Sequence, residues 1–137
     1  MSFYQEIIAV SPPFEVGFDE NERKMFSMNF DCMVTAPATD FVREIGRLIN
    51  DASLGTFGTD MFIGMEAILP TGDGPYITII NTGGSESLDT HNVAQGVTYE
   101  MRSCQIVVRA RTYDSANTRA LAVWRVLDGI RNTTVVA

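Results

Sequence analysis

Alternation of apolar and polar residues predicts a protein rich in β-strands. The clearest strand covers residues 25–34, where Phe26, Met28 and Phe30 begin a row of apolar residues at every second position. Such alternation is typical of an antiparallel strand that is buried on one face. Residues 76–82 are rich in β-branched side chains and predict a second strand. The other predicted strands cover residues 3–10, 61–69, 99–111 and 133–137.

Two segments instead have the period of an amphipathic helix. In residues 40–51, Phe41, Ile45 and Leu48 fall on one face, and Thr39 is the expected cap. The second predicted helix covers residues 115–131. We expect Asp114 to cap it. Its predicted buried side consists of Ala116, Ala120, Leu121, Val123, Trp124, Leu127 and Ile130.

Two features interrupt this regular pattern. The apolar phase of residues 99–111 slips near Ser103, which predicts a β-bulge at that point. Residues 83–97 have no period and few large apolar side chains, so we expect a long polar loop there. Residues 70–75, with the sequence PTGDGP, are a predicted turn.

These elements predict an α+β fold, a mostly antiparallel twisted β-sheet with two helices packed on one face. Phe41, Leu48, Trp124 and Leu127 should lie between the helices and the sheet. A chain of 137 residues is expected to form a single domain, residues 1–137, and it is long enough to bury a core without a disulfide or a metal.

The charge balance argues against a nucleic-acid-binding protein. The formal net charge is −7, whereas phosphate contacts need clustered Lys and Arg residues. Six of the ten cations fall in the last third of the chain, and most carboxylates come before it. This division fits solvated faces of a strand and a helix. It also fits complementary patches on opposite sides of a subunit, which a head-to-tail ring requires.

Other sequence signals concern the compartment. Cys32 and Cys104 lie within apolar alternations, so we expect buried free thiols; a disulfide would need an oxidising compartment. No apolar run approaches the ~20 residues of a membrane-spanning helix. The N-terminus does not resemble a secretory signal.

Candidate catalytic residues are few. His91 is the only histidine, and Asp89 alone lies at a plausible ligand spacing from it. Ser85, Asp89 and His91 could be imagined as a triad, but a nucleophile and a base on one loop lack a fixed geometry. The glycines before Ser85 are not followed by the Gly-Lys-Ser/Thr sequence of a phosphate loop. We therefore expect no enzyme, with no catalytic, cofactor-binding or metal-binding residue.

Several short motifs resemble the tail-terminator (tail-completion) proteins of long-tailed bacteriophages. Within residues 40–136 these are the first helix, a strand that ends in Thr82-Gly83-Gly84, a variable loop, a strand that closes on residues 107–111, and a helix after Asp114. A second block, residues 7–31, resembles the closing segment of such proteins. It contains the motifs SPPF (residues 11–14), GFDE (residues 17–20) and FSMNF (residues 26–30).

The order of the two blocks differs from that of the family. The closing segment follows the second helix in the family, whereas here it comes first, which suggests a circular permutation of the chain or of its numbering. The resemblance implies that residues 1–36 are a strand pair that completes the sheet, and that residues 37–137 are a helix-strand-strand-helix body. A numbering effect would place the Cα atoms of Ala137 and Met1 about 3.8 Å apart.

The resemblance implies a structural virion protein at the head–tail junction, made in the host cytoplasm. Its subunits would form a homo-oligomeric ring, expected to be a hexamer, on the tail-tube protein. The ring would end tail polymerisation and join the tail to the head-completion (connector) protein. DNA would only pass through the lumen, and neither a membrane nor a cofactor is implied. The residues expected to contact neighbouring subunits or partners are Asp19, Glu20, Asn21, Glu22, Ser85, Glu86, Asp89, His91 and Asn92.

Two other classes of function stay open. One is a different head–tail connector or adaptor, or a tail-tube subunit; a tube subunit generally needs a long hairpin, which residues 70–75 or the long loop would have to supply. The other is a small ligand-binding or enzymatic α+β domain, for which a deep apolar pocket would be evidence.

Overall fold

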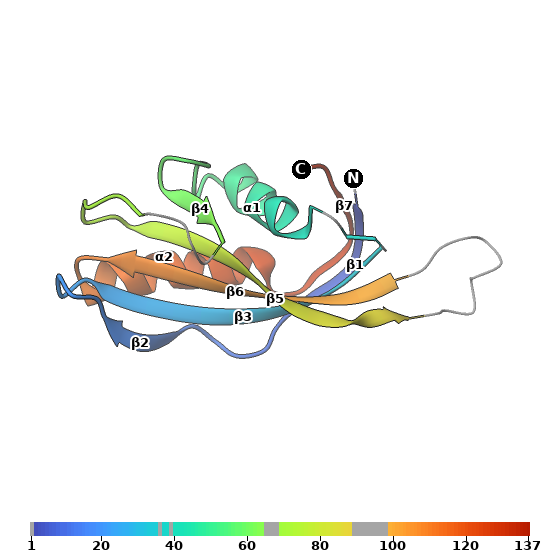
Figure 1. Cartoon of the computed structure of the whole chain (residues 1–137), viewed down its shortest axis with the longest axis horizontal. Coiled ribbons are helices and arrows are strands. Elements are labelled where there is room, and N and C mark those ends of the chain that lie inside the picture. Colours follow the sequence, from blue (N-terminus) through green and yellow to red (C-terminus); the bar gives the residue numbers. More distant parts are fainter. Residues whose placement is uncertain (1, 36, 39, 65–68, 89–98) are drawn as a thin grey trace.

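The chain folds into one curved and twisted β-sheet with two helices against it (Figure 1). The computed structural model describes residues 2–35, 37–38, 40–64, 69–88 and 99–137. The strands are β1 (Ser2–Ala9), β2 (Phe14–Phe18), β3 (Lys24–Thr35), β4 (Met61–Ile63), β5 (Tyr76–Leu88), β6 (Tyr99–Ala110) and β7 (Ile130–Val135). The helices are α1 (Phe41–Asp51) and α2 (Tyr113–Leu127). The predicted α+β class is therefore confirmed.

The strands follow the order β4-β5-β6-β3-β1-β7, and β2 pairs with β3 outside this path. Every pairing is antiparallel except that of β4 with β5. Strands β1 and β2 lie along the same edge of β3, because β1 pairs with residues 30–34 and β2 with residues 24–27. Pro12 and Pro13 separate β1 from β2, as expected of residues that cannot donate to a strand ladder.

The core lies between the sheet and the helices. Phe26, Met28 and Phe30 of β3 are buried, as the alternation predicts, and Ile106 and Val108 of β6 are buried beside them. The helices contribute apolar residues at helical spacing to the same cluster, namely Phe41, Ile45, Ile49, Ala116, Ala120, Val123 and Leu127. Leu48 and Trp124 are only partly buried and pack against this cluster.

Strands β5 and β6 differ from the predicted pattern. β5 continues through the glycines to Leu88, so the first part of the predicted loop is strand, and the remainder lies outside the described residues. No bulge occurs at Ser103, because β6 pairs with β3 in an unbroken register. The irregularities lie in β5 instead, between Asn81 and Gly83 and between Ser85 and Ser87. The buried phase of β6 does not slip; it continues through the buried, hydrogen-bonded Glu100.

Helix α2 begins and ends earlier than predicted. Thr112, not Asp114, is its cap, and the Thr112 hydroxyl accepts a hydrogen bond from the backbone nitrogen of Ser115. The helix ends at Leu127, and Gly129, with φ of 85°, leads directly into β7. Ile130 and Arg131 therefore belong to a strand, which begins earlier than the predicted residues 133–137. Thr39, the predicted cap of α1, lies outside the described residues.

Two further strands differ from the sequence prediction. β4 covers only Met61–Ile63 of the predicted residues 61–69, and residues 65–68 lie outside the described part. β2 has no counterpart among the predicted strands.

The two ends of the chain lie on adjacent strands. Ser2 of β1 pairs with Val135 of β7, and the two strands are antiparallel (Figure 1). A permuted order would join these strands as a hairpin. The proposed test, the distance from Ala137 to Met1, involves a residue outside the described part, so the permutation stays a prediction.

Candidate contact surfaces

The predicted contact residues Asp19, Glu20, Asn21 and Glu22 form the turn between β2 and β3. The Asp19 carboxylate accepts hydrogen bonds from the backbone nitrogens of Asn21 (3.0 Å) and Arg23 (2.9 Å). It also accepts one from Arg23 Nε at 2.8 Å. Asp19 therefore holds the turn in shape, whereas Glu20, Asn21 and Glu22 are exposed.

Two arginines fasten this turn to the PTGDGP turn of residues 70–75. Arg23 Nη1 donates to the carbonyl oxygens of Thr71 (2.9 Å) and Gly72 (2.8 Å). Arg109 Nη2 donates to the carbonyl oxygen of Pro70 at 2.7 Å, and its guanidinium lies 5.3 Å from the centre of the Tyr76 ring. Arg23 is 7% exposed, so its guanidinium is largely shielded from bulk water. This end of the sheet is thus a fixed surface rather than a pair of independent loops.

The electrostatics of the cluster follow from these contacts. Desolvation raises the pKa of Asp19. The hydrogen bonds from the two backbone nitrogens and the Arg23 guanidinium outweigh it and hold the pKa below its ordinary value. Desolvation and the charge of Arg23 lower the pKa of Arg109, and Asp19, 3.7 Å away, opposes this. Asp19 therefore stays ionised between two cations.

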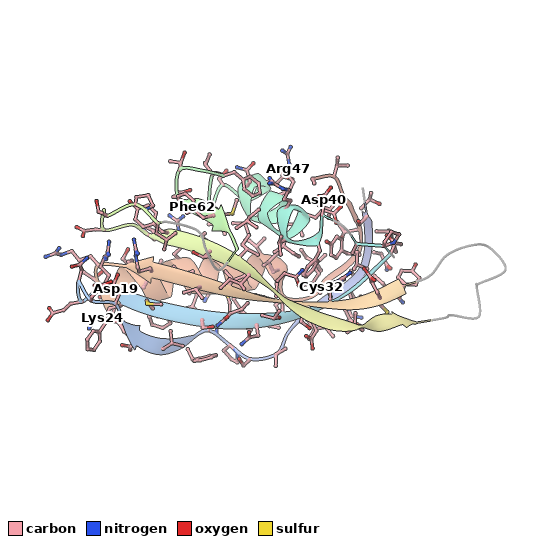
Figure 2. All side chains as sticks on the ribbon, viewed as in Figure 1. Asp19, Lys24, Cys32, Asp40, Arg47 and Phe62 are labelled. Atoms are coloured by element: carbon pink, nitrogen blue, oxygen red, sulfur yellow. The ribbon has the colours of Figure 1, made fainter. Side chains whose placement is uncertain are left out.

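The second predicted group lies at the opposite end of the sheet. The backbone of Ser85 pairs with Met101, and Glu86 lies at the second irregularity of β5. Asp89, His91 and Asn92 lie outside the described residues. Met101 is paired with Met33, near the far end of β3 from Lys24. About nine residues of strand, or roughly 30 Å, separate the two groups, so they do not form one site. Figure 2 shows Asp19 and Lys24 together at one end, away from Cys32.

The face of the sheet opposite the helices carries a polar ladder. Ser103 Oγ donates to Asp31 Oδ1 at 2.7 Å, and Gln105 Nε2 donates to Ser27 Oγ at 2.8 Å. These residues alternate with the buried core residues of β3 and β6, so the strand period places them on the outer side. We call this the outer face. Asp31, Ser103 and Gln105 are half-buried and Ser27 is fully buried, so these four side chains satisfy one another and only part of the set meets water.

The edge formed by β2 has a different character. Phe14, Val16 and Phe18 are 45%, 48% and 64% exposed. Lys24 Nζ lies 4.9 Å from the centre of the Phe18 ring. We call Phe14–Phe18 the β2 edge. Sequence reasoning missed this strand, although apolar residues at positions 14, 16 and 18 after the two prolines are a recognisable strand signal.

Two buried acidic residues were also missed. Glu44 of α1 is fully buried and accepts a hydrogen bond from the Tyr4 hydroxyl at 3.0 Å. Glu100 accepts from the backbone nitrogen of Ala38 and from Arg102 Nε. A carboxylate that faces the core gives no periodic signal, because the pattern marks such a position as polar.

The described residues contain little that suggests chemistry. No group of three or more potential metal ligands occurs among them. Cys32 and Cys104 are free and buried, as predicted, and burial raises the pKa of the Cys104 thiol to about 12. An open hollow of about 330 Å³ lies beside the start of α2, lined by Pro75, Asp114, Ser115, Thr118 and Arg119. Within the described part of the chain, no helix is long and apolar enough to span a membrane.

The fold and its surfaces define a small α+β protein with an exposed strand edge and hydrogen-bonded polar pairs on the outer face of its sheet. Comparison with known families gives its role. Residues 48–134, more than half of the chain, match the family described as bacteriophage tail terminator protein. The chain therefore belongs to the bacteriophage tail terminator family, and it is a structural component of a phage tail. No curated protein and no solved structure matches it.

Proposed function

We propose that this protein caps the tail tube as a ring, expected to be a hexamer, and thereby ends tail polymerisation. The ring would also join the tail to the head-completion protein. The observation that carries the proposal is the family match, together with surfaces of unlike character on one subunit. The polar outer face and the apolar β2 edge are not interchangeable, and a head-to-tail ring uses two different surfaces on each subunit.

Termination of a polymer follows from such unlike surfaces. One face of the ring must resemble the docking surface of a tube subunit, and the opposite face must lack the surface to which the next tube subunit would bind. The net charge of −7 supports a lumen through which DNA passes, because carboxylates repel phosphates within about 8 Å at physiological salt. We place the contacts at two positions, the exposed residues Glu20, Asn21 and Glu22 and the segment that contains Ser85, Glu86, Asp89, His91 and Asn92.

The test is electron microscopy of phage particles produced without this protein. Tails of uncontrolled length would support termination. Tails of normal length that are not attached to heads would restrict the function to joining, and normal particles would contradict the proposal.

One observation favours a second candidate, a tail-tube subunit. β5 and β6 contain 13 and 12 residues and pair with each other over about 40 Å within the sheet, and a tube wall needs long paired strands of this kind. The same experiment separates the two candidates, because loss of a tube subunit gives heads without tails.

A further inference from the structure

The β2 edge differs from every other edge of the described sheet. β2 pairs with β3 on one side only, so the backbone of Phe14–Phe18 presents an open strand edge. Five of the eight large apolar side chains that are exposed in the described part lie between residues 8 and 18. Exposed apolar side chains on a strand with one open edge mark a surface that can receive another strand.

The other edges are formed by β7, by β4 and by the part of β5 beyond residue 79, which β4 does not pair with and where residues 81–84 are polar or glycine. β7 exposes Arg131, Asn132 and Thr134 and buries Val135. β4 has only three residues, of which Met61 is buried and the other two are half-buried. Polar side chains and short length are the usual means by which proteins block unwanted strand pairing. Because those edges have this protection, the apolar β2 edge is not a general property of this sheet.

The charges beside the β2 edge indicate what kind of segment fits it. Glu15, Glu20 and Glu22 are exposed, and none has an ion pair in the described structure, whereas Asp19 is paired with Arg23. Lys24 is the one cation of β3, and it lies over the Phe18 ring. The edge is therefore apolar with an acidic border. Its complement is an extended segment with alternating apolar and basic side chains.

The shape of the edge restricts the contact to a short segment. Pro12 and Pro13 precede β2, and the register shifts between Glu15 and Gly17, where Gly17 has a φ of 117°. Prolines and a bulge prevent a long, flat pairing surface and so oppose unlimited aggregation. About five residues can pair, which suits one added strand.

We propose that the β2 edge binds a basic, extended segment of an adjoining protein by strand addition. That the segment belongs to an adjoining protein of the phage particle rests on the proposed function, because a tail cap must bind its neighbours. The surface itself lies outside the family-matched residues 48–134. Its test uses purified protein and does not depend on tail length, so failure of one proposal is distinguishable from failure of the other.

The experiment compares two capped eight-residue peptides, one alternating lysine with valine and the other alternating glutamate with valine. Binding is followed through the amide chemical shifts of the folded protein. We expect the basic peptide to shift the amides of Phe14–Phe18 and to protect them from hydrogen exchange, and the acidic peptide to bind at least about tenfold more weakly, a difference of about 1.4 kcal/mol. Raising the salt concentration should weaken the basic peptide's binding.

Variants test the edge itself. Glu15→Lys should weaken binding of the basic peptide about tenfold, and Val16→Ser about fivefold; both side chains are exposed, so the fold should persist. Asp51→Lys is the matched control, because it makes the same charge change at an exposed carboxylate on α1 and should leave binding unchanged.

Three results would overturn the proposal. One is equal binding of the two peptides. Another is a set of shifted amides that excludes β2. The third is self-association of the protein that Val16→Ser abolishes, because a second copy would then be the occupant of the edge.

Discussion

The N-terminal strands β1–β3 and the family-matched residues 48–134 make different contributions to the same sheet. The matched part includes β6 and β7, yet these strands are not neighbours, because β3 and β1 lie between them. β3 is paired along its whole length with β6. The matched part therefore cannot close its own sheet. The family match covers residues 48–134, whereas two adjacent strands inside the sheet, β3 and β1, come from the N-terminal region.

Side-chain contacts also join the two regions. Tyr4 of β1 donates, inside the core, to Glu44 of α1, the helix that runs into the matched part at residue 48. Arg23, at the start of β3, binds the turn of residues 70–75. These ties and the strand pairing predict that the N-terminal strands unfold together with the matched part rather than separately. The following changes test this, from the largest expected effect to the smallest.

Removal of a core side chain from the N-terminal strands should have the largest effect. Phe30 of β3 is fully buried at the centre of the sheet. Phe30→Ala should lower the free energy of unfolding by about 3–5 kcal/mol, through lost burial and the cavity that remains. Urea unfolding monitored by circular dichroism and by Trp124 fluorescence measures this, and both signals should shift together.

Phe18→Ala is the matched control, because Phe18 is in the same region but is 64% exposed. We expect its effect to stay within about 0.5 kcal/mol. If Phe30→Ala fails to fold, Phe30→Leu provides a milder version of the same test. A Trp124 signal that does not move with the Phe30 variant would show that the two regions unfold independently.

Loss of the arginine that joins the two turns should have the next largest effect. Arg23→Ala removes two hydrogen bonds to the carbonyl oxygens of Thr71 and Gly72 and the ion pair with Asp19, and should cost roughly 2–3 kcal/mol. Arg111→Ala is the control, because Arg111 contacts Asp73 of the same turn but its side chain is 73% exposed. Equal, small effects of the two variants in thermal unfolding would contradict a structural role for Arg23.

The strands and helices that carry a clear period could be predicted from the sequence. The alternation of Phe26, Met28 and Phe30 identified β3 and its buried face, and the spacing of Phe41 and Ile45 identified α1. The α+β class followed from these elements. The family resemblance also came from sequence motifs, and the matched residues confirm it.

The errors have physical causes. Gly83 and Gly84 suggested a loop, but glycine is required within β5: a Cβ on Gly84 would lie 2.0 Å from the carbonyl oxygen of Met101. The bulge was assigned to Ser103 because a buried Glu100 interrupts the apolar phase of β6. Asp19 was predicted as a contact residue from its place in an acidic loop, but its carboxylate is hydrogen-bonded within its own turn. The open β2 edge leaves no mark on the local pattern, because it results from the absence of a second described strand beside β2.

A smaller effect is expected at the bond between Tyr4 and Glu44. Tyr4→Phe removes a hydrogen bond to a buried carboxyl group and should cost about 1–2 kcal/mol. Tyr113→Phe, at an exposed tyrosine, is the control. Burial, and then the charge of Glu44, raise the pKa of Tyr4 far above its ordinary value. The stabilisation is therefore complete below the unfolded pKa of about 10 and is lost as the pH rises above it.

Absorbance at 295 nm checks the same bond in the unmodified protein. Tyr4 should ionise only together with unfolding, and this late step should be absent from Tyr4→Phe. Ionisation of every tyrosine at about pH 10 in the folded protein would show that Tyr4 is not held by Glu44 in solution.

The smallest effect should come from the charge of Asp19, because asparagine at this position keeps a side-chain oxygen that can accept the hydrogen bonds from the backbone nitrogens of Asn21 and Arg23. The pKa of Asp19 is lowered in the folded protein, so its contribution is present above the unfolded pKa of about 3.9 and is lost as the pH falls through the folded value. Asp19→Asn should therefore cost less than about 1 kcal/mol at pH 7, and the variant and the unmodified protein should become equally stable in acid. Urea midpoints measured at several pH values test this convergence. A difference that persists at the lowest pH would mean that Asp19 acts through the shape of its turn, and that the link between the N-terminal strands and residues 70–75 depends on Arg23 and Arg109 without the charge between them.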